Sequence, residues 1–392
     1  MNIPKLRFKE FTDDWKTHKL KNICYINPKS SNLNDKFYYI DLECVQYGRL
    51  KYIQCINKLE APSRAQRVLL PQDILFQSVR AYQKNSYFLK KENDIQTVAS
   101  TGYAQLRTKK ELSLYIYYYL YFQKFIDKVN KLSTGTSYPA INSTDLGMIN
   151  INIPSFQEQE KIANFLSTVD KKIENLENTI TSLENQKKGL LQQIFSQKLR
   201  FKDKNGNNYP NWEKKKLGDI TTSYSGGTPS VNVKDYYNGT IPFIKSGEIH
   251  NSFTETFITE TGLNSSSAKL VKKGDLLFAL YGATSGDTSI SKINGAINQA
   301  ILCVRSTTLN LHYLYQLLNF YRNKLLSIYL QGGQGNFSAT IFKNLIFNFP
   351  CLEEQTKIAD FLSAFDRKLE NQKAQLEHWQ QIKKGLLQQM FV

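Results

Sequence analysis

Apolar residues recur on alternating steps of four and three in two long stretches of the chain. Lys187 interrupts the first series, which comprises Ile162, Leu166, Val169, Ile173, Leu176, Ile180, Leu183, Leu190 and Ile194. Gln372 and Lys383 interrupt the second, which comprises Ile358, Leu362, Phe365, Leu369, Leu376, Trp379, Leu386 and Met390. An apolar seam of this length predicts a coiled coil.

The direction of pairing follows from the length of the connection. Each predicted helix begins just after a proline, Pro154 or Pro350, and opens with acidic residues, which suit the helix dipole. Two matching seams in one chain most simply pair with each other, and pairing between two chains is the second possibility. Residues 196–211 alone join the first helix to the next block, and a parallel pair would stretch this linker to its limit. We therefore expect an antiparallel pair with one block at each end.

The blocks beside the helices show a different pattern. Residues 16–150 and 212–349 contain short alternating runs such as KFYYIDLECV, DILFQSV, DLLFALYG and AILCVR, separated by turns. This pattern is typical of short strands, and a Tyr/Leu-rich segment near the end of each block predicts one helix. We expect an α+β fold in both blocks.

The two halves of the chain are copies of each other. PSFQEQEKIANFLSTVDKKIENLE (154–177) aligns without a gap with PCLEEQTKIADFLSAFDRKLENQK (350–373), and QKKGLLQQIF (186–195) recurs as IKKGLLQQMF (382–391). LYIYYYLYF (114–122) aligns less closely with LHYLYQLLN (311–319). LRFKEFTDDW (6–15) recurs as LRFKD…YPNW (199–212), directly after the first long helix. A tandem duplication with pseudo-two-fold symmetry therefore places Leu6 near Phe391.

The duplication divides the chain into five segments. Residues 1–153 form a first domain, of which 1–15 are a short circularly permuted segment. Residues 154–197 form the first repeated helix, 198–211 a linker, 212–349 the second domain and 350–392 the second repeated helix. The expected architecture is two tandem pseudo-symmetric domains separated by a long antiparallel two-helix coiled coil.

The net charge of the chain indicates which class of binding partner to expect. The 392 residues carry a formal net charge of +17, which favours a polyanion, nucleic acid before membrane, over the alternative of a generically basic protein. Five cysteines without a CxxC pair indicate reduced packing residues. The apolar run LYIYYYLYF is too short and too rich in tyrosine to cross a bilayer. We expect a soluble, cytoplasmic protein.

Loops at corresponding places in both halves combine small residues with polar donors. They are SVRAYQKNSY (78–87), ALYGATSGDTS (279–289) and the turns STGTSY (133–138) and QGGQGNFS (331–338). Glycine permits close backbone approach, and the polar side chains suit phosphates and base edges. A single such loop is more often only a loop, but the duplication favours two DNA-recognition surfaces. The candidate DNA-binding residues are Ser78, Arg80, Tyr82, Lys84, Thr134, Gly135, Thr136, Ser137, Tyr138, Lys245, Ser246, Tyr281, Thr284, Ser285, Gln331, Gly332, Gln334 and Asn336.

The repeated helix ends are candidate contacts for partner proteins. The residues are Lys187, Lys188, Gly189, Gln192, Lys383, Lys384, Gly385 and Gln388. Gly189 and Gly385 either permit a close approach of a helix or partner, or merely loosen the helix end.

The sequence lacks the motifs of several enzyme classes. No GxxxxGK[ST] phosphate loop and no Asn-Pro-Pro-aromatic tetrapeptide of amino-methyltransferases occurs. Asp73 has no downstream Glu-x-Lys of a nuclease, and we expect it in a turn before a strand. The four histidines are scattered and form no metal pattern. These observations predict a targeting subunit without catalytic or metal-binding residues.

Several phrases together resemble the specificity subunits of type I restriction–modification systems. They are GGTPS (226–230) followed by YYNGTIPFIKSGEI (236–249), DLECVQYGRL (41–50), and the helix endings QKKGLLQQ and IKKGLLQQ. The resemblance spans essentially the whole chain. The first block has INPKSSNLN (26–34) in place of the GGTPS phrase, so we expect it to hold its target differently.

The resemblance implies a function in DNA restriction and modification. Such a subunit is non-catalytic and recognises a bipartite double-stranded DNA target, one half-site per domain, with the coiled coil as a ruler for the spacer. Two modification subunits methylate adenine with S-adenosylmethionine, and restriction subunits cleave with ATP and Mg. We expect this chain to bind none of these cofactors. The alternatives are a self-contained DNA methyltransferase and a coiled-coil scaffold that binds only protein.

Overall fold

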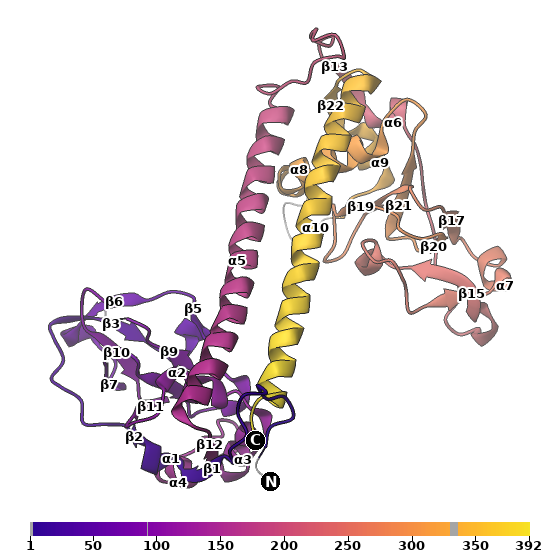
Figure 1. Cartoon of the computed structure of the whole chain (residues 1–392). Helices are drawn as coiled ribbons and strands as arrows, with labels where there is room; N and C mark the ends of the chain where they lie inside the picture. The colour runs from indigo at the N-terminus through magenta and orange to yellow at the C-terminus, as the bar shows by residue number, and fades with distance from the viewer. Residues whose placement is uncertain (1–2, 92, 330–335) are drawn as a thin grey trace. The chain divides into compact units, whose positions relative to one another are not determined.

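The chain divides into two compact units. The computed structural model describes residues 3–91, 93–329 and 336–392. Unit 1 comprises Met1–Asn178 and Ala374–Val392, and unit 2 comprises Thr179–Lys373. Two long helices, α5 (Phe156–Phe195) and α10 (Leu352–Gln389), each contribute one part to unit 1 and the other part to unit 2 (Figure 1). Both begin two residues after a proline, as the sequence predicts.

Unit 1 contains two four-stranded sheets and two strand pairs. One sheet has the order β2 (Cys24–Ile26), β11 (Tyr103–Thr108), β8 (Ile74–Gln77), β9 (Tyr87–Phe88). The other has the order β6 (Gln54–Asn57), β3 (Lys36–Ile40), β10 (Thr97–Ser100), β7 (Ala65–Leu69). The pairs are β1 (Lys16–Lys19) with β12 (Asn150–Ile153) and β4 (Val45–Gln46) with β5 (Arg49–Leu50).

Unit 2 repeats this topology. Its first sheet has the order β14 (Thr222–Ser225), β21 (Ile301–Arg305), β18 (Leu276–Ala279), β19 (Thr288–Ile290). Its second has the order β16 (Phe257–Ile258), β15 (Tyr237–Ile244), β20 (Gly295–Ile297), β17 (Lys269–Val271), and β13 (Glu213–Lys216) pairs with β22 (Ile346–Phe349). In each unit the second sheet contains one parallel pair, β3 with β10 or β15 with β20. The predicted duplication and α+β class are confirmed.

Further helices and 3-10 turns connect the strands of each unit. Unit 1 has α1 (Leu20–Ile23), α2 (Ser113–Tyr119), α3 (Gln123–Leu132), α4 (Ser143–Met148) and the 3-10 turns η1 (Leu42–Cys44), η2 (Lys58–Glu60) and η3 (Ala81–Gln83). Unit 2 has α6 (Leu217–Ile220), α7 (Glu260–Asn264), α8 (Leu311–Tyr329), α9 (Ala339–Asn344) and the turns η4 (Lys234–Tyr236) and η5 (Ser246–Glu248). The predicted Tyr/Leu-rich helix is continuous in unit 2, whereas the extended backbone of Phe122 divides it in unit 1.

The two long helices run antiparallel within each unit. In unit 1 Asp170 of α5 accepts from the Lys383 ammonium of α10 at 2.6 Å. In unit 2 Lys187 of α5 pairs with Asp366 of α10. These pairs are the same two positions of the repeat, 196 residues apart. Antiparallel pairing is therefore confirmed, and the seam of α5 is buried except for half-buried Leu190.

Contacts at these pairs correct the alignment of the shorter helices. Tyr118 donates to Asp170 at 2.8 Å, and Gln316 donates to Asp366 at 2.6 Å. Tyr118 therefore corresponds to Gln316, one residue away from the partner that the aligned sequences indicate. The sequence alignment failed here because a run of alternating Tyr and Leu matches itself at neighbouring offsets.

The LRFK segments occupy equivalent places in the two units. The Leu6 amide donates to the carbonyl of Gln389 at 2.8 Å, and the Leu199 amide donates to that of Gln193 at 3.0 Å. Arg7 forms a two-pronged ion pair with buried Glu158, as Arg200 does with buried Glu354. The prediction that Leu6 lies close to the end of the second repeated helix is confirmed.

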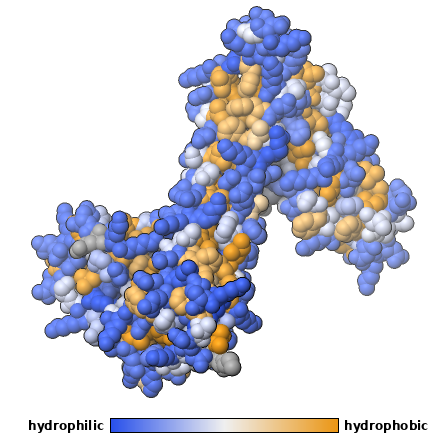
Figure 2. All heavy atoms as spheres, viewed as in Figure 1, coloured by the Kyte–Doolittle hydropathy of each residue, from blue (hydrophilic) through white to orange (hydrophobic). Residues whose placement is uncertain are grey.

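Each unit has its own hydrophobic cores. The rings of Trp15 and Tyr115 pack together in the main core of unit 1, with centroids 6.3 Å apart. Those of Trp212 and Tyr313 do so at the same centroid distance in unit 2. On the face seen in Figure 2, hydrophilic residues dominate and hydrophobic residues appear as separate patches. All five cysteines are free. Within the described residues, no helix combines the length and apolarity that a membrane span requires.

Candidate nucleic-acid interface

Two of the predicted loops in unit 1 lie together. The backbone of Val79 bridges that of Ala140, and the Ile141 amide donates to the Ser78 carbonyl at 3.1 Å. The Arg80 amide donates to the carbonyl of Pro139 at 2.7 Å. Residues 78–84 and 133–141, distant in sequence, therefore form one surface, which we call loop pair 1.

Arg80 is a cation that loop pair 1 holds beside an exposed aromatic ring. Its backbone is left-handed, with φ 55°, and its guanidinium donates to the Ser137 carbonyl at 3.2 Å. The guanidinium lies 4.1 Å from the centre of the Tyr138 ring, which is 66% exposed. A planar cation held on an exposed aromatic ring suits phosphates and base edges.

The other predicted residues of loop pair 1 differ in whether their side chains are exposed to solvent. Thr134 and Ala140 exchange backbone hydrogen bonds of 2.9 Å, closing a turn in which the side chains project outward. Ser78 is instead buried, and its hydroxyl donates to the Gly102 carbonyl at 2.8 Å. Its hydroxyl therefore serves the fold. The exposed members of the set are Tyr82, Thr134, Gly135, Thr136, Ser137 and Tyr138.

Lys84 is anchored within unit 1. Its ammonium donates to the Gln123 side chain at 2.7 Å. Burial lowers the pKa of Lys84, the nearby charge of Lys384 lowers it further, and Asp127 opposes both effects. Lys84 therefore orders the base of loop pair 1 against α3.

Unit 2 builds an equivalent surface. The Phe337 amide donates to the Leu280 carbonyl at 2.7 Å, just as Ile141 donates to Ser78 in unit 1. Residues 280–287 and 336–338 therefore form loop pair 2. Of the predicted residues, Tyr281 and Thr284 are half-buried, and buried Ser285 donates to the Leu280 carbonyl at 3.1 Å. Asn336 is exposed, whereas Gln331, Gly332 and Gln334 lie outside the described residues.

A charged cluster in unit 2, which sequence reasoning missed, holds loop pair 2. Asp287 lies 2.9 Å from the His250 ring nitrogen and 3.9 Å from the Arg322 guanidinium, which also donates to the Ser285 carbonyl. Burial raises the pKa of Asp287, but the hydrogen bond and charge of His250 and the charge of Arg322 lower it overall. These three residues belong to separate segments, and no local motif in the sequence links them.

His250 also connects loop pair 2 to the predicted residues Lys245 and Ser246. Lys245 precedes η5, which ends two residues before His250, and its ammonium donates to the Thr256 hydroxyl at 2.8 Å. Lys245 is exposed and Ser246 half-buried. The Lys245–His250 segment therefore extends loop pair 2 with a further cation.

Some of the predicted partner-binding residues make contacts within the chain, and others are exposed. Lys187 and Lys383 form the ion pairs between α5 and α10, and the Gln388 side chain accepts from the Gln123 amide at 2.8 Å. These three therefore hold the chain together. A Cβ at Gly189 would meet no atom within 4 Å, and one at Gly385 would meet only the Gln389 side chain, at 3.7 Å. No helix of the described chain approaches either glycine closely, which leaves the approach of a partner and a loosened helix end as the two possibilities. Lys188, Gln192 and Lys384 are exposed.

Comparisons with known proteins agree on one family. The model of the type I restriction modification DNA specificity domain matches residues 12–185 and 209–378. The type I restriction enzyme MjaIX specificity subunit of Methanocaldococcus jannaschii is 30% identical over 211 residues, which cover 50% of this chain and only 48% of that relative. The putative type I restriction enzyme MjaX specificity subunit of the same organism is 24% identical over 413 residues, which cover 98% and 95% of the two chains.

A solved structure shares the fold over the full length. The type I restriction-modification system S subunit from M. genitalium superimposes with a TM-score of 0.67 at 16% identity, covering 100% of this chain and 99% of that one.

Proposed function

This chain belongs to the type I restriction–modification DNA specificity family, and from that premise we propose that it recognises a bipartite double-stranded DNA target. Each unit contacts one half-site through its loop pair. The observation that carries this proposal is the repetition of one surface: the Ile141–Ser78 and Phe337–Leu280 hydrogen bonds join equivalent loops on sheets of equal strand order.

The chemistry of the loop pairs supports DNA as the ligand. Arg80 on Tyr138 and the Lys245–His250 segment present cations beside polar and aromatic side chains. The net charge of +17 favours association with a polyanion at long range. Phosphate contacts then orient the duplex, while base-edge contacts from the exposed loop side chains distinguish sequences.

We further propose that the chain has no catalytic role and delivers other subunits to DNA. Two modification subunits, using S-adenosylmethionine, methylate adenine, and restriction subunits supply cleavage that depends on ATP and Mg. The exposed residues Lys188, Gln192 and Lys384 of the repeated helix ends are the proposed contacts with these subunits. Within the described part of the chain, no cluster of three or more metal-ligating side chains occurs.

The deciding experiment is co-expression with the neighbouring modification subunit, followed by single-molecule sequencing of host DNA for methylated adenine. We expect a bipartite motif with a fixed gap, and exchange of residues 212–349 should change one half only. Methylation by this chain alone would identify a self-contained methyltransferase. Absence of sequence-specific DNA binding with the partner present, and no methylation in either case, would identify a scaffold.

A further inference from the structure

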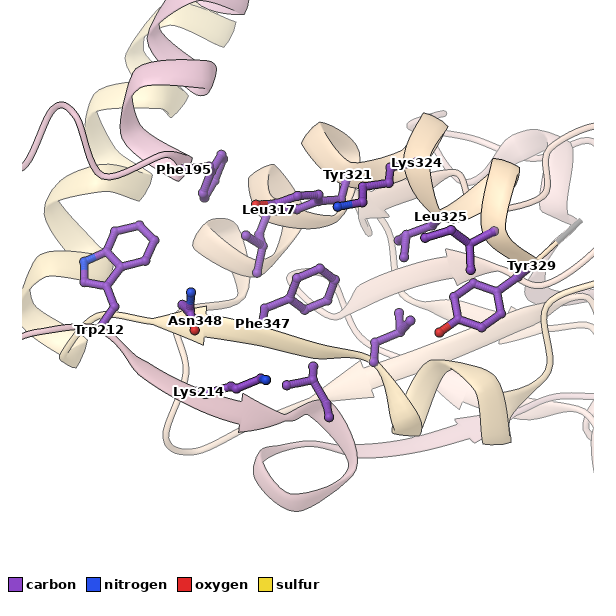
Figure 3. A pocket seen from close by; sticks show the side chains of 13 residues that line it. Phe195, Trp212, Lys214, Leu317, Tyr321, Lys324, Leu325, Tyr329, Phe347 and Asn348 are labelled. Carbon is purple, nitrogen blue, oxygen red and sulfur yellow. The ribbon is translucent and has the colours of Figure 1, made fainter.

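A pocket of about 330 Å³ lies in unit 2, beside the end of α5. Most of the residues that line it are aromatic or aliphatic, among them Phe195, Trp212, Leu317, Tyr321 and Phe347 (Figure 3). Exposed apolar side chains, Ile328, Tyr329 and Ile346, also line it, and Ile328 and Ile346 are each more than half exposed. No residue of loop pair 2 lines the pocket, but Tyr329 of the pocket contacts Phe337 of loop pair 2, with ring centroids 6.0 Å apart.

The equivalent place in unit 1 holds a residue of the chain itself. The Val392 carbonyl accepts from the Tyr119 hydroxyl at 2.8 Å and from the Asn152 side chain at 3.1 Å. The neighbouring Phe391 packs on Tyr115 and Tyr119, with ring centroids 5.5 and 5.4 Å apart. Unit 1 therefore shows what this architecture binds: a chain segment with an aliphatic side chain, Val392, and an oxygen acceptor.

Unit 2 retains the architecture but directs its own chain elsewhere. Phe195 packs on Tyr313 as Phe391 does on Tyr115, and Asn348 pairs with Lys214 across β22 and β13 as Asn152 does with Thr17. After Phe195, however, the backbone turns back. The Gln197 amide donates to the Ile194 carbonyl at 2.9 Å, with a left-handed φ of 60° at Gln197. Ser196, the counterpart of Val392, is consequently exposed.

The pocket has gained positive charge. Lys214 stands where unit 1 has Thr17, and Lys324 of α8 lines the same pocket. Figure 3 shows Lys324 and Tyr321 on the α8 side and Lys214 on the β13 side, with Phe347 between them. Both lysines are exposed, and neither ammonium forms an ion pair with any residue that the structure describes. Leu317 replaces the hydroxyl donor Tyr119, and Asn348 and the two lysines are donors in the pocket, together with the hydroxyls of Tyr321 and Tyr329.

We propose that this pocket binds an extended segment of a partner protein in which aliphatic residues are flanked by carboxylates. The aliphatic side chain occupies the apolar floor beside Phe195 and Phe347. The carboxylates contact Lys214 and Lys324, and a backbone carbonyl accepts from Asn348. The pocket and both lysines belong to unit 2, the chemistry of the bound segment is inferred from the equivalent place in unit 1, and the proposal goes beyond DNA recognition.

A labelled peptide tests the proposal on the full-length chain without DNA or other subunits. The probe is fluorescein-Gly-Ser-Asp-Leu-Val-Glu-Ser, and binding is followed by fluorescence anisotropy. A neutral peptide with Asn and Gln in place of the acids, and a peptide with Ser-Ser in place of Leu-Val, are the matched ligands. Lys214→Glu and Lys324→Glu test the pocket, and Lys292→Glu, an exposed lysine of unit 2 outside it, is the control.

We expect the acidic aliphatic peptide alone to bind, with each pocket variant raising its Kd about fivefold because an exposed ion pair is replaced by repulsion. Lys292→Glu should leave the Kd unchanged. A photo-leucine version of the peptide should cross-link to the segments carrying Tyr321, Leu325 or Phe347.

Three outcomes would overturn the proposal. They are equal binding of the neutral peptide, cross-links only outside the pocket, and no binding at concentrations up to about 1 mM, where even weak pocket ligands are detected. Displacement by a short single-stranded oligonucleotide at lower concentration than by unlabelled peptide would identify the pocket as a nucleic-acid site instead.

Discussion

The two copies use different residues to shape the backbone where the second has the GGTPS phrase and the first has INPKSSNLN. At Gly226, in the GGTPS phrase, a Cβ would lie 1.8 Å from the Ile297 carbonyl oxygen, so only glycine fits. In the first copy Asn27 has a left-handed φ of 49°, and its side chain bonds to the Gln105 amide and the Ser143 hydroxyl. Asparagine tolerates this conformation because its side chain bonds locally. The departure from GGTPS therefore has a structural basis.

Replacement of Arg80 tests loop pair 1. Arg80→Ala should weaken binding to the first half-site and leave the preference at the second intact. A lost base contact should cost about 1–3 kcal/mol at one base position, whereas a lost phosphate contact should weaken all sequences and lower the salt slope by about one. Binding of half-site variants across a salt series measures both quantities. Unchanged first half-site affinity would contradict the assignment.

Lys84 gives a related prediction with a different reason. Lys84→Ala should also weaken binding to the first half-site alone, but through loosening of the loop that Gln123 anchors. Proteolysis of loop pair 1 should therefore quicken in Lys84→Ala more than in Tyr82→Ala, whose side chain is exposed. Equal protection of the loop in the two variants would argue against an anchoring role.

Gly48 offers a test of packing in unit 1. A Cβ there would lie 2.3 Å from the Tyr117 hydroxyl oxygen, at a φ of +81°. At Gly206, with φ +84°, a Cβ would meet no atom within 4 Å. Both Gly→Ala variants bear a backbone cost of about 1–2 kcal/mol, and Gly48→Ala adds about 1–3 kcal/mol of overpacking. Urea unfolding of the two variants should show this difference, and equal losses would contradict it.

The contacts of Asp275 predict that part of the protein's folding stability is lost at acidic pH. Burial raises the pKa of this carboxyl, but hydrogen bonds from Arg305 and the Lys272 amide, with the charge of Arg305, lower it overall. A lowered pKa in the folded state contributes stability above the unfolded value near 3.8, and this contribution is lost as pH falls through the folded value. The unfolding midpoint of Asp275→Asn should therefore fall less between neutral and acidic pH. Asp219→Asn, at an exposed position of unit 2, should follow the unmodified protein.

At the scale of elements, interruptions in the apolar seam prove as informative as the seam. Periodicity predicted both long helices, because burial of apolar residues dominates at that scale, and the short linker 196–211 predicted their antiparallel pairing. Lys187 and Lys383 appear in the sequence as breaks exposed to partners. In the structure they meet Asp366 and Asp170, which also bind Gln316 and Tyr118. Ion pairs between distant residues could not be predicted, because they depend on the register of the two helices.

Because Lys187 forms an ion pair and the neighbouring Lys188 is exposed, replacing each in turn gives a matched test of the ion pair. Lys187→Ala should destabilise the protein by about 1–3 kcal/mol, since it leaves the carboxylate of Asp366 partly buried without its cation. Lys188→Ala, at an exposed position, should change stability by no more than about 0.5 kcal/mol. Denaturant unfolding distinguishes them. If Lys188→Ala alone impairs co-purification with the modification subunit, the proposed partner contact is supported; normal co-purification would exclude it.

At the scale of the whole molecule, the repeated sequence and the compact units do not coincide. The sequence places each long helix with one copy, and the predicted boundaries at residues 153, 197 and 349 follow the repeat. The compact units instead change over within α5, at Asn178, and within α10, at Lys373. Sequence reasoning found the duplication and singled out the loops, but did not predict that they meet. It could not divide the helices, since that depends on which side chains they bury.

The length of the two helices yields a prediction about the DNA target. Removal of matched heptads from α5 and α10 should change the preferred spacer and leave both half-sites unchanged. The reason is that each element is one uninterrupted helix, which transmits a change in length directly. Methylation mapping with the shortened chain provides the measurement. Altered half-sites would show that the helices do not act as a ruler.

The division of the helices also sets an order for synthesis on the ribosome. Unit 2 is one continuous stretch, so every residue of its core is available once Lys373 has left the exit tunnel. Unit 1 waits for the last turns of α10, because Leu6 bonds to Gln389 and Tyr119 to Val392. Closing so long a loop is entropically unfavourable until that segment arrives. The portion of the gene translated second is therefore expected to fold first, and the earliest residues to remain open to chaperones and proteases longest.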